Sequence, residues 1–327
     1  MFLVHNNNTN PEFNLALEEY LLQGLKKPAI MLWRNDKSVI VGCNQNTFAE
    51  INQLFCNSNG IKVVRRLTGG GAVYHDLGNI NYTIISDKKE SLGDYGAFSS
   101  DLRAFLHNLG LDTQLSQRND ILVNNKKICG NAQSIKNGLL IHHGCILFST
   151  NLQTLSQALK VDKKKFLDKG IKSVKSRVVN ISTLLDEKIS QDKFLNSFSN
   201  FLKEKIKLVD YYLSEKDLTE INKLIENKYS TYEWNYGNSP EYNFINSQKT
   251  SAGIIEIKLL IKDGKIKNMK IYGDFFNNHN ISELENKFID KNYRIEDLNI
   301  LIDELNINNF ILGINKKEFI NLLFKNN

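Results

Sequence analysis

Residues 65–79 read Arg-Arg-Leu-Thr-Gly-Gly-Gly-Ala-Val-Tyr-His-Asp-Leu-Gly-Asn. A strand expected at 62–66 leads into three glycines at 69–71, where a ligand can lie directly against the main chain and N–H groups can point at an anion. Arg65 and Arg66 add permanent positive charge that suits a phosphate or carboxylate. The stretch matches neither the Walker A loop nor the Rossmann fingerprint. It therefore predicts an anion-binding loop and suggests a nucleotide site, although a plain flexible turn would also explain three glycines.

A second polar stretch lies at 118–133, where two strands are joined by a short turn. This hairpin would place Asn119 and Asp120 on one arm and Lys127 on the other. A lysine beside a phosphate can follow the charge that develops in a transition state. The alternative is a hairpin whose lysines are merely exposed.

Two adjacent histidines, His142 and His143, follow on a predicted strand. Neighbouring residues of a strand point to opposite faces, so the two side chains cannot both ligate one ion from a regular strand. We expect one inward histidine that hydrogen-bonds its neighbours.

The rest of the chain is predicted as alternating strands and helices. Thr9 and Glu12 have the spacing of a capping box ahead of a helix. The apolar runs 30–33 and 38–42 are predicted as a hairpin, and separate strands are predicted at 139–141 and 145–148. Helical patterns before residue 247 give way to strand patterns after it, and Asp263-Gly264 favours a type I′ turn in a second hairpin there. We therefore predict domains at 1–246 and 247–327.

Five spaced motifs together resemble one family, the lipoate–protein ligases. They are RRLTGGGAVYHDLGN (65–79), RND (118–120), KICGNA (127–132), HHG (142–144) and KGIKSVKSRVVN (169–180). The segment 233–237 with Pro240 is similar to the signature that closes the family's large domain. The resemblance spans residues 10–325 and implies an α/β fold. The implied fold has two parts. One is a large biotin/lipoate-ligase-like catalytic domain with a mixed β-sheet flanked by helices, and the other is a small α+β C-terminal accessory domain.

The resemblance also implies a two-step reaction. ATP and lipoate give lipoyl-AMP and pyrophosphate, with Mg²⁺ as cofactor. The lipoyl group then passes to a specific lysine of a lipoyl-domain protein, either an H protein or an E2 subunit of a 2-oxoacid dehydrogenase. No nucleic-acid partner, membrane partner or covalent enzyme intermediate is implied.

The resemblance also implies roles for the residues of this sequence that occupy the family's functional positions in these motifs. Lys127 matches the family's essential lysine, and Asp120 is the expected magnesium ligand. The lipoate and lipoyl-AMP positions are Arg66, Thr68, Gly69, Gly70, Gly71, Ala72, Val73, His143 and Gly144. The nucleotide positions are Asn79, Asn119, Asp120, Lys127, Ala132, Ser176, Arg177 and Val178. Trp33 is a plausible wall for the apolar tail. Cys43 departs from the family, which usually has arginine there.

Composition and charge agree with this class. The 327 residues are 41% hydrophobic and 24% charged, which excludes a wholly disordered chain. The net charge is +6, and residues 160–177 alone carry eight Lys/Arg against two Asp, so the positive field is local and suits an anionic ligand or acidic partner. There is no secretory signal or apolar run long enough to span a membrane, and the four cysteines have no C-x-x-C spacing. We expect a cytoplasmic protein with reduced thiols.

Three rival functions remain open at this point. An octanoyl or lipoyl transferase of the same fold would need a cysteine nucleophile, but residues 149–190 contain none, and Cys129 and Cys145 lie within strand motifs. A non-catalytic sensor of lipoyl-adenylate would be expected to lack Lys127 or the glycines. A DNA-binding role has only the basic run in its favour, without a helix-turn-helix module.

Overall fold

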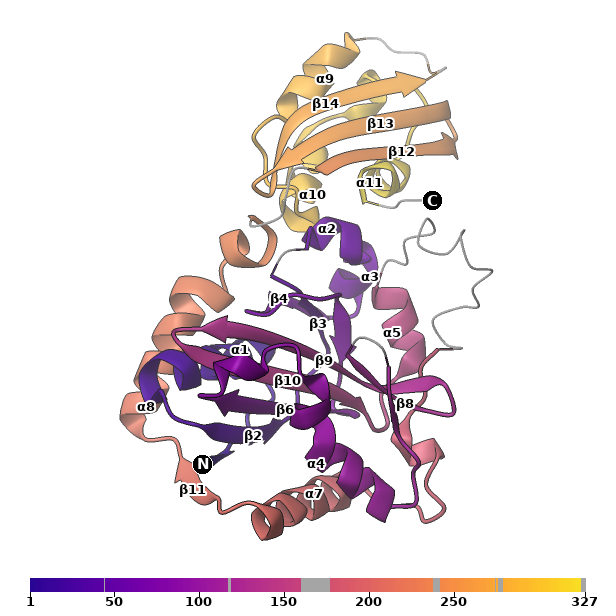
Figure 1. The fold of residues 1–327 in the computed structure, drawn as a ribbon. Helices are drawn as coiled ribbons and strands as arrows, with labels where there is room; N and C mark the ends of the chain where they lie inside the picture. The colour runs from indigo at the N-terminus through magenta and orange to yellow at the C-terminus, as the bar shows by residue number, and fades with distance from the viewer. Residues whose placement is uncertain are drawn as a thin grey trace. The chain divides into compact units, whose positions relative to one another are not determined.

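The computed structural model describes residues 1–43, 45–116, 119–159, 177–237, 242–273, 275 and 279–324 (Figure 1). The chain divides into two compact units. Unit 1 comprises Met1–Cys43 and Ile61–Thr231, and unit 2 comprises Asn44–Gly60 and Tyr232–Asn327. Each unit combines helices with a β-sheet, so the predicted α/β class is confirmed.

Unit 1 is built on an eight-stranded mixed sheet. Strand β1 runs parallel to both of its neighbours, and the other pairs are antiparallel. Across the sheet the strands are β11 (Val209–Tyr212), β1 (Phe2–His5), β2 (Ala29–Trp33), β6 (Asn79–Ser86), β10 (Leu139–Leu147), β9 (Lys126–Lys136), β8 (Asp120–Val123) and β7 (Gln114–Leu115). A second, three-stranded sheet has the order β4 (Lys62–Arg65), β3 (Ser38–Val41) and β5 (Val73–His75).

Helices cover both faces of the large sheet, which explains why every residue of β2 is buried. On one face, α4 (Tyr95–Asn108) and α7 (Gln191–Lys205) pack through Phe105 and Phe198 against Ile30 and Leu32. On the other face, α1 (Pro11–Tyr20) reaches β6 through a hydrogen bond from Thr83 to Glu18. Among the described residues of unit 1, the other helices are α5 (Leu152–Ala158) and α8 (Glu215–Leu224), with single-turn or π-type segments at Leu21–Leu25, Lys89–Ser91, Ile181–Thr183 and Ile225–Tyr229.

Unit 2 has its own core on a three-stranded antiparallel sheet of β12 (Tyr242–Thr250), β13 (Gly253–Lys262) and β14 (Lys265–Gly273). Burial alternates along β13, which is typical of a sheet covered on one face. Positive φ angles at Asp263 and Gly264 fit the predicted type I′ turn. The helices are α2 (Thr47–Glu50), α3 (Gln53–Ser58), α9 (Ile281–Lys287), α10 (Ile295–Glu304) and α11 (Lys316–Phe324), with short segments at Glu233–Gly237 and Ile307–Asn309.

Three local predictions are wrong. The runs 30–33 and 38–42 do not form a hairpin, because β2 lies between β1 and β6 whereas β3 belongs to the small sheet. The N-cap of α1 is Asn10 rather than Thr9, whose hydroxyl donates instead to Asp36. The two strands expected at 139–141 and 145–148 are one continuous strand, β10, which ends at Leu147 and pairs along its length with β6 and β9.

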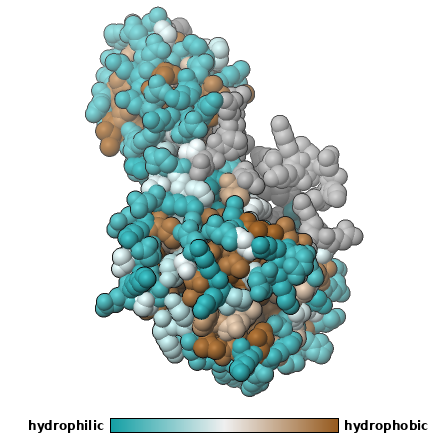
Figure 2. All heavy atoms as spheres, turned by 60° about the vertical axis from the view of Figure 1, so that its left-hand side comes forward, coloured by the Kyte–Doolittle hydropathy of each residue, from teal (hydrophilic) through white to brown (hydrophobic). Residues whose placement is uncertain are grey.

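The unit boundary after Thr231 lies upstream of the boundary expected after residue 246. Strand β12 begins at Tyr242 and pairs continuously with β13, so it cannot be divided at 246. Residues 44–60 also belong to unit 2, which no sequence pattern indicated. Within the part of the chain that the structure describes, no helix has the length and apolar character needed to cross a bilayer. Hydrophilic residues dominate the visible surface in Figure 2, with apolar residues in patches between them.

Candidate functional site

Unit 1 contains a cavity between its two sheets. The small sheet contributes Ile40, Val73 and His75, and the large sheet contributes residues of β2, β6, β9 and β10. The glycine loop between β4 and β5 closes one side, and Leu15 of α1 lines the wall as well. The topology therefore brings the glycine loop, the Lys127 hairpin and the histidine strand to one cavity.

Most of the predicted site residues line this cavity: Arg66, Gly70, Gly71, Ala72, Val73, Asn119, Lys127, Ala132, His143 and Gly144. Trp33 lines it too. Thr68, Gly69, Asn79, Asp120, Arg177 and Val178 are not among its lining residues. Ser176 and the basic segment before Arg177 lie outside the described residues.

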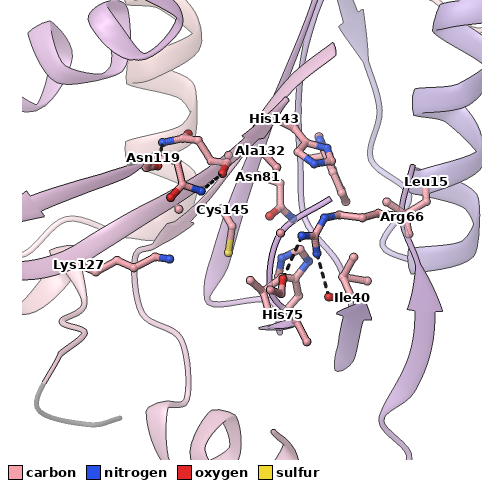
Figure 3. A pocket seen from close by; sticks show the side chains of 18 residues that line it. Leu15, Ile40, Arg66, His75, Asn81, Asn119, Lys127, Ala132, His143 and Cys145 are labelled. Atoms are coloured by element: carbon pink, nitrogen blue, oxygen red, sulfur yellow. Dashed lines mark hydrogen bonds between the residues drawn. The ribbon is translucent and has the colours of Figure 1, made fainter. Parts of the chain in front are cut away.

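The two ends of the cavity differ in chemistry (Figure 3). Lys127 and Asn119 lie at one end, and Leu15 and Ile40 lie at the other, with Cys145 between them. A ligand that carries an acidic group on an apolar tail would match this polarity. The Arg66 guanidinium lies beside Leu15 and Ile40, but it donates to the carbonyls of Ile40, Gly69 and Gly71 and to the Thr68 hydroxyl, so it is already engaged within the wall. An ammonium at one end and the side chains of Leu15 and Ile40 at the other favour such a ligand over a uniformly polar one.

Lys127 is the cation at the polar end. Its ammonium lies 2.8 Å from a carboxylate oxygen of Asp120, and both side chains are about one-third exposed. The main chain of Lys127 pairs with the segment that follows the basic run: its N–H donates to the carbonyl of Arg177, and Val179 N–H donates to the carbonyl of Lys127. Arg177 and Val178 are thereby held beside the lysine although neither lines the cavity.

Arg66 organises the glycine loop from within. Its guanidinium donates to the carbonyls of Gly69, Gly71 and Ile40 and to the hydroxyl of Thr68. Burial lowers the pKa of Arg66 to about 10, which still leaves it charged at neutral pH. The loop is thus shaped by internal hydrogen bonds, and Gly70 within it has a φ of 93°, which favours glycine.

A buried hydrogen-bond network connects Arg66 to helix α1. The Thr68 hydroxyl lies 2.7 Å from His143 Nε2, and His143 Nδ1 lies 2.9 Å from Glu18 Oε1. Glu18 is 1% exposed and also accepts from Thr83. Because Thr68 accepts from Arg66, its own proton can go to His143. The network therefore satisfies a buried carboxylate and positions the histidine in the cavity wall.

The two histidines face opposite sides of β10, as predicted. His143 lines the cavity, whereas His142 stacks on Phe98 and hydrogen-bonds Tyr82 and Gln133. Burial, together with the neighbouring His143, lowers the pKa of His142 to about 3. Within the described part of the chain, no group of three His, Cys, Asp or Glu side chains could hold a metal ion. The two rings therefore do not face a common site.

Sequence reasoning missed several residues of this site. Leu15 and Glu18 lie on α1, far from every motif, and a helix face with one glutamate gives no signal of a site. Gly130 and Asn131 stand inside the KICGNA motif but were not selected. Cys145, which the sequence places only within a strand motif, also lines the cavity.

A family model, the lipoyl protein ligase A/B catalytic domain, matches residues 10–203. A second, the bacterial lipoate protein ligase C-terminus, matches residues 239–323. The chain is 39% identical to lipoate-protein ligase LplJ of Bacillus subtilis, over 99% of this chain and 100% of that protein. It is 37% identical to lipoate–protein ligase 1 of Staphylococcus aureus, over 98% of this chain and 99% of that protein.

Solved structures agree. A bipartite lipoate protein ligase of Thermoplasma acidophilum, described with its E2 lipoyl domain, has a TM-score of 0.64 and 32% identity, covering 74% of this chain and 98% of that one. A putative lipoate protein ligase of the same organism with bound lipoic acid has a TM-score of 0.63 and 30% identity, covering 72% and 98%. A lipoate-protein ligase A bound with ATP has a TM-score of 0.62 and 30% identity, with the same coverage. This chain therefore belongs to the lipoate–protein ligase family.

Proposed function

We propose that the chain activates lipoate with ATP and attaches the lipoyl group to a lysine of a lipoyl-domain protein. The observation that carries this proposal is the position of Lys127 at one end of a cavity whose other end presents the apolar side chains of Leu15 and Ile40. An acid with an apolar tail would enter tail first and leave its carboxylate beside the ammonium. Members of the same family have been solved with lipoic acid and with ATP.

The first step joins the two substrates. A carboxylate oxygen of lipoate attacks the α-phosphorus of ATP, and pyrophosphate leaves with the electrons of the broken P–O bond. Lys127 would stabilise the negative charge on the phosphoryl oxygens, and Asp120 would orient that ammonium through their ion pair. The product, lipoyl-AMP, has a good leaving group in place of the carboxylate oxygen.

The second step transfers the acyl group. The neutral ε-amine of the acceptor lysine attacks the acyl carbon, the bond from that carbon to the phosphate oxygen breaks, and AMP leaves with its electrons. The amine gives up one proton to solvent, and an amide remains. Lys127 lies where it could also stabilise the charge on the carbonyl oxygen, so one cation would serve both steps. The chain would supply mainly position and electrostatic stabilisation.

Nucleotide contacts would come from residues grouped around Lys127. Asn119 and Ala132 line the cavity, and Arg177 and Val178 are held next to it by the main-chain bonds of Lys127. Asp120 is a single, part-exposed carboxylate, which fits Mg²⁺ because this ion usually takes one or two carboxylates together with substrate phosphates. The ion would neutralise phosphate charge there. Asn79 is fully buried and would act indirectly through Asn81 and Cys145.

The acceptor is proposed to be an H protein or an E2 lipoyl domain. The Thermoplasma relative is described with its E2 lipoyl domain, which supports this class of partner. We place the reaction in the cytoplasm, with neither a membrane nor a nucleic acid as partner.

The cysteine-dependent transferase is not favoured. Cys145 lines the cavity, but burial raises its pKa to about 12, so the thiol is protonated at neutral pH. Burial also holds the pKa of Cys129 well above its usual range. A nucleophilic cysteine needs the opposite shift.

The test is the intact mass of a purified lipoyl domain incubated with the protein, lipoate, Mg²⁺ and ATP. We expect a lipoyl mass gain only when ATP is present. Lys127→Ala should reduce both this gain and pyrophosphate release by about a hundredfold or more, because the charge at the reacting oxygens is lost. Lys126→Ala is the matched control, since Lys126 is exposed and absent from the cavity wall.

The outcomes separate the rival functions. Near-normal lipoylation by Lys127→Ala would contradict the proposed mechanism. Mass gain without ATP, from an acylated carrier, would instead identify a transferase. No gain under either condition, with no pyrophosphate release in the absence of a carrier, would favour a non-catalytic sensor.

A further inference from the structure

A line of hydrogen bonds crosses the large sheet from an exposed loop to the polar end of the cavity. It begins at Gly93, which precedes α4, and ends at Asn119, which lines the cavity at the same end as Lys127 (Figure 3). The side chains between these two ends come from β6, β9 and β10, and they are Gln133, His142, Tyr82 and Asn131. The last three are buried, and hydrogen bonds in such surroundings are stronger than in water.

The outer half of this line determines where His142 carries its proton. The main-chain N–H of Gly93 donates to Gln133 Oε1 over 2.7 Å, so the other end of the Gln133 amide is the NH₂ group. Gln133 Nε2 lies 3.0 Å from His142 Nδ1, which must therefore accept. Burial, together with His143, lowers the pKa of His142 to about 3, so the ring is neutral at pH 7 and its one proton is on Nε2.

The inner half continues in the same direction. His142 Nε2 lies 3.1 Å from the Tyr82 hydroxyl and donates to it. That hydroxyl donates to Asn131 Oδ1 over 2.5 Å, and burial holds the pKa of Tyr82 well above its usual range, so the proton stays in place. Asn131 Nδ2 then donates to the carbonyl of Asn119 over 2.8 Å. Each group thus accepts from one neighbour and donates to the next, an arrangement in which hydrogen bonds strengthen one another.

Asn131 holds Asn119 through further hydrogen bonds. The main-chain N–H of Asn131 also donates to the carbonyl of Asn119, over 3.1 Å, and Asn119 Nδ2 donates to the carbonyl of Asn131. Because the Nδ2 end of Asn119 is engaged in this way, Oδ1 is the end of its side chain that can accept from a ligand. The direction of that oxygen depends on Asn131, and the Tyr82 hydroxyl fixes which way the Asn131 amide is turned.

We propose that Asn131, Tyr82 and His142 are positioning residues for the nucleotide, which hold Asn119 so that its Oδ1 accepts a hydrogen bond from ATP. This inference rests on the proposed function. Asn131 lines the cavity, whereas Tyr82 and His142 are not among the lining residues and act through it. ATP has N–H and O–H donors on its base and ribose. Lipoate is ionised at neutral pH and has no donor, so the line of hydrogen bonds favours one of the two substrates only.

The measurement is KM and kcat of pyrophosphate release, with ATP and lipoate each varied in turn. Tyr82→Phe removes the hydroxyl from the line and keeps the ring. We expect KM for ATP to rise about three- to tenfold, the range of one modest hydrogen bond. The values of kcat and of KM for lipoate should change less than about twofold, because a contact made equally in the ground and transition states affects KM and not kcat.

Two variants of His142 test whether the effect passes along the line. His142→Gln can still present an N–H to the Tyr82 hydroxyl, whereas His142→Leu cannot. We therefore expect His142→Leu to raise KM for ATP, by less than Tyr82→Phe does, and His142→Gln to restore most of the loss. A role in packing alone would not distinguish the two substrates.

Tyr229→Phe is the matched control. Tyr229 is also fully buried in unit 1, and its hydroxyl donates to Glu19, which does not line the cavity. Loss of this hydroxyl should lower the melting temperature much as Tyr82→Phe does, and it should leave KM for ATP unchanged.

An unchanged KM for ATP in folded Tyr82→Phe would overturn the inference, with thermal melting as the check on folding. KM values for ATP and lipoate that rise together, or a rise for ATP that is equal in Tyr229→Phe, would also overturn it. If Tyr82→Phe did not fold, equal KM for ATP in the two His142 variants would overturn it instead. No pyrophosphate release by the unaltered protein would contradict the proposed function itself, whereas normal release with these negative results would contradict the positioning role alone.

Discussion

At the scale of single residues, the cavity wall is held by buried polar groups whose donors and acceptors match. Glu18 Oε1 accepts from both Thr83 and His143, and Thr83 in turn accepts from the indole N–H of Trp33. A buried carboxylate without such partners would be strongly unfavourable. The same network fixes Trp33 and His143, two residues that line the cavity, so stability and ligand positioning depend on one carboxylate.

Two replacements of Glu18 separate the stabilising effect of its hydrogen bonds from that of its negative charge. Glu18→Ala leaves the His143 and Thr83 donors unsatisfied, and we expect the free energy of unfolding to fall by about 1–3 kcal/mol for such a loss. Glu18→Gln should cost less, because an amide oxygen can accept from the same two groups. Urea denaturation monitored by circular dichroism measures both. If the Gln variant were as unstable as the Ala variant, the negative charge and not the hydrogen bonding would be the stabilising feature.

At the scale of elements, glycines in β9 and β10 leave space at two positions beside the cavity, Gly130 and Gly144. A Cβ at Gly144 would overlap the ring of Tyr82 and the amide of Asn131, both within the packed sheet. A Cβ at Gly130 would lie 2.5 Å from Lys127 Nζ, the mobile end of a long side chain. Gly144 therefore makes room for the packed sheet, and Gly130 makes room for the Lys127 ammonium.

The substitutions Gly144→Ala and Gly130→Ala should consequently affect different properties, stability in the first case and activity in the second. Gly144→Ala should destabilise the protein by about 1–3 kcal/mol, the usual cost of overpacking a core. Gly130→Ala should leave the melting temperature nearly unchanged but reduce pyrophosphate release, because Lys127 must move. Each variant is the control for the other in paired melting and activity assays. A stable, fully active Gly130→Ala protein would show that the position of the ammonium is not restricted by this strand.

What the sequence predicts at this scale depends on whether the signal is local. The glycine loop, the hairpin with Lys127 and the opposed histidines follow from local patterns, and the structure has all three. The pairing of β2 with β1 and β6 depends on segments distant in the sequence, so local pattern alone wrongly predicts a hairpin turn in the short link between residues 33 and 38. Glu18 and Leu15 reach the site only through packing of α1 on the sheet, which no spacing within the helix predicts.

At the scale of the whole molecule, the chain passes between its two units more than once. Residues 44–60 leave unit 1 and supply Phe48 and Leu54 to the core of unit 2 before β4 returns. The Thr47 hydroxyl also donates to the carbonyl of Asn235 within unit 2. Dividing the chain at one point near residue 231 or 246 would therefore leave unit 2 without residues 44–60. These residues precede the glycine loop in the sequence, yet they belong to unit 2.

Charge is also unevenly distributed over the whole chain, since residues 160–177 carry a net +6, as much as the entire protein. We expect kcat/KM for transfer to an acidic lipoyl domain to fall with added salt, because screening reduces such a field beyond about 8–10 Å. The variant K163Q/K164Q/K165Q removes half of that excess and should show both a lower rate at low salt and a shallower dependence on salt. Acceptor titrations at several NaCl concentrations provide the measurement. Identical salt dependence in the two proteins would mean that this segment does not attract the acceptor, and any remaining sensitivity would have to come from charges elsewhere in the chain.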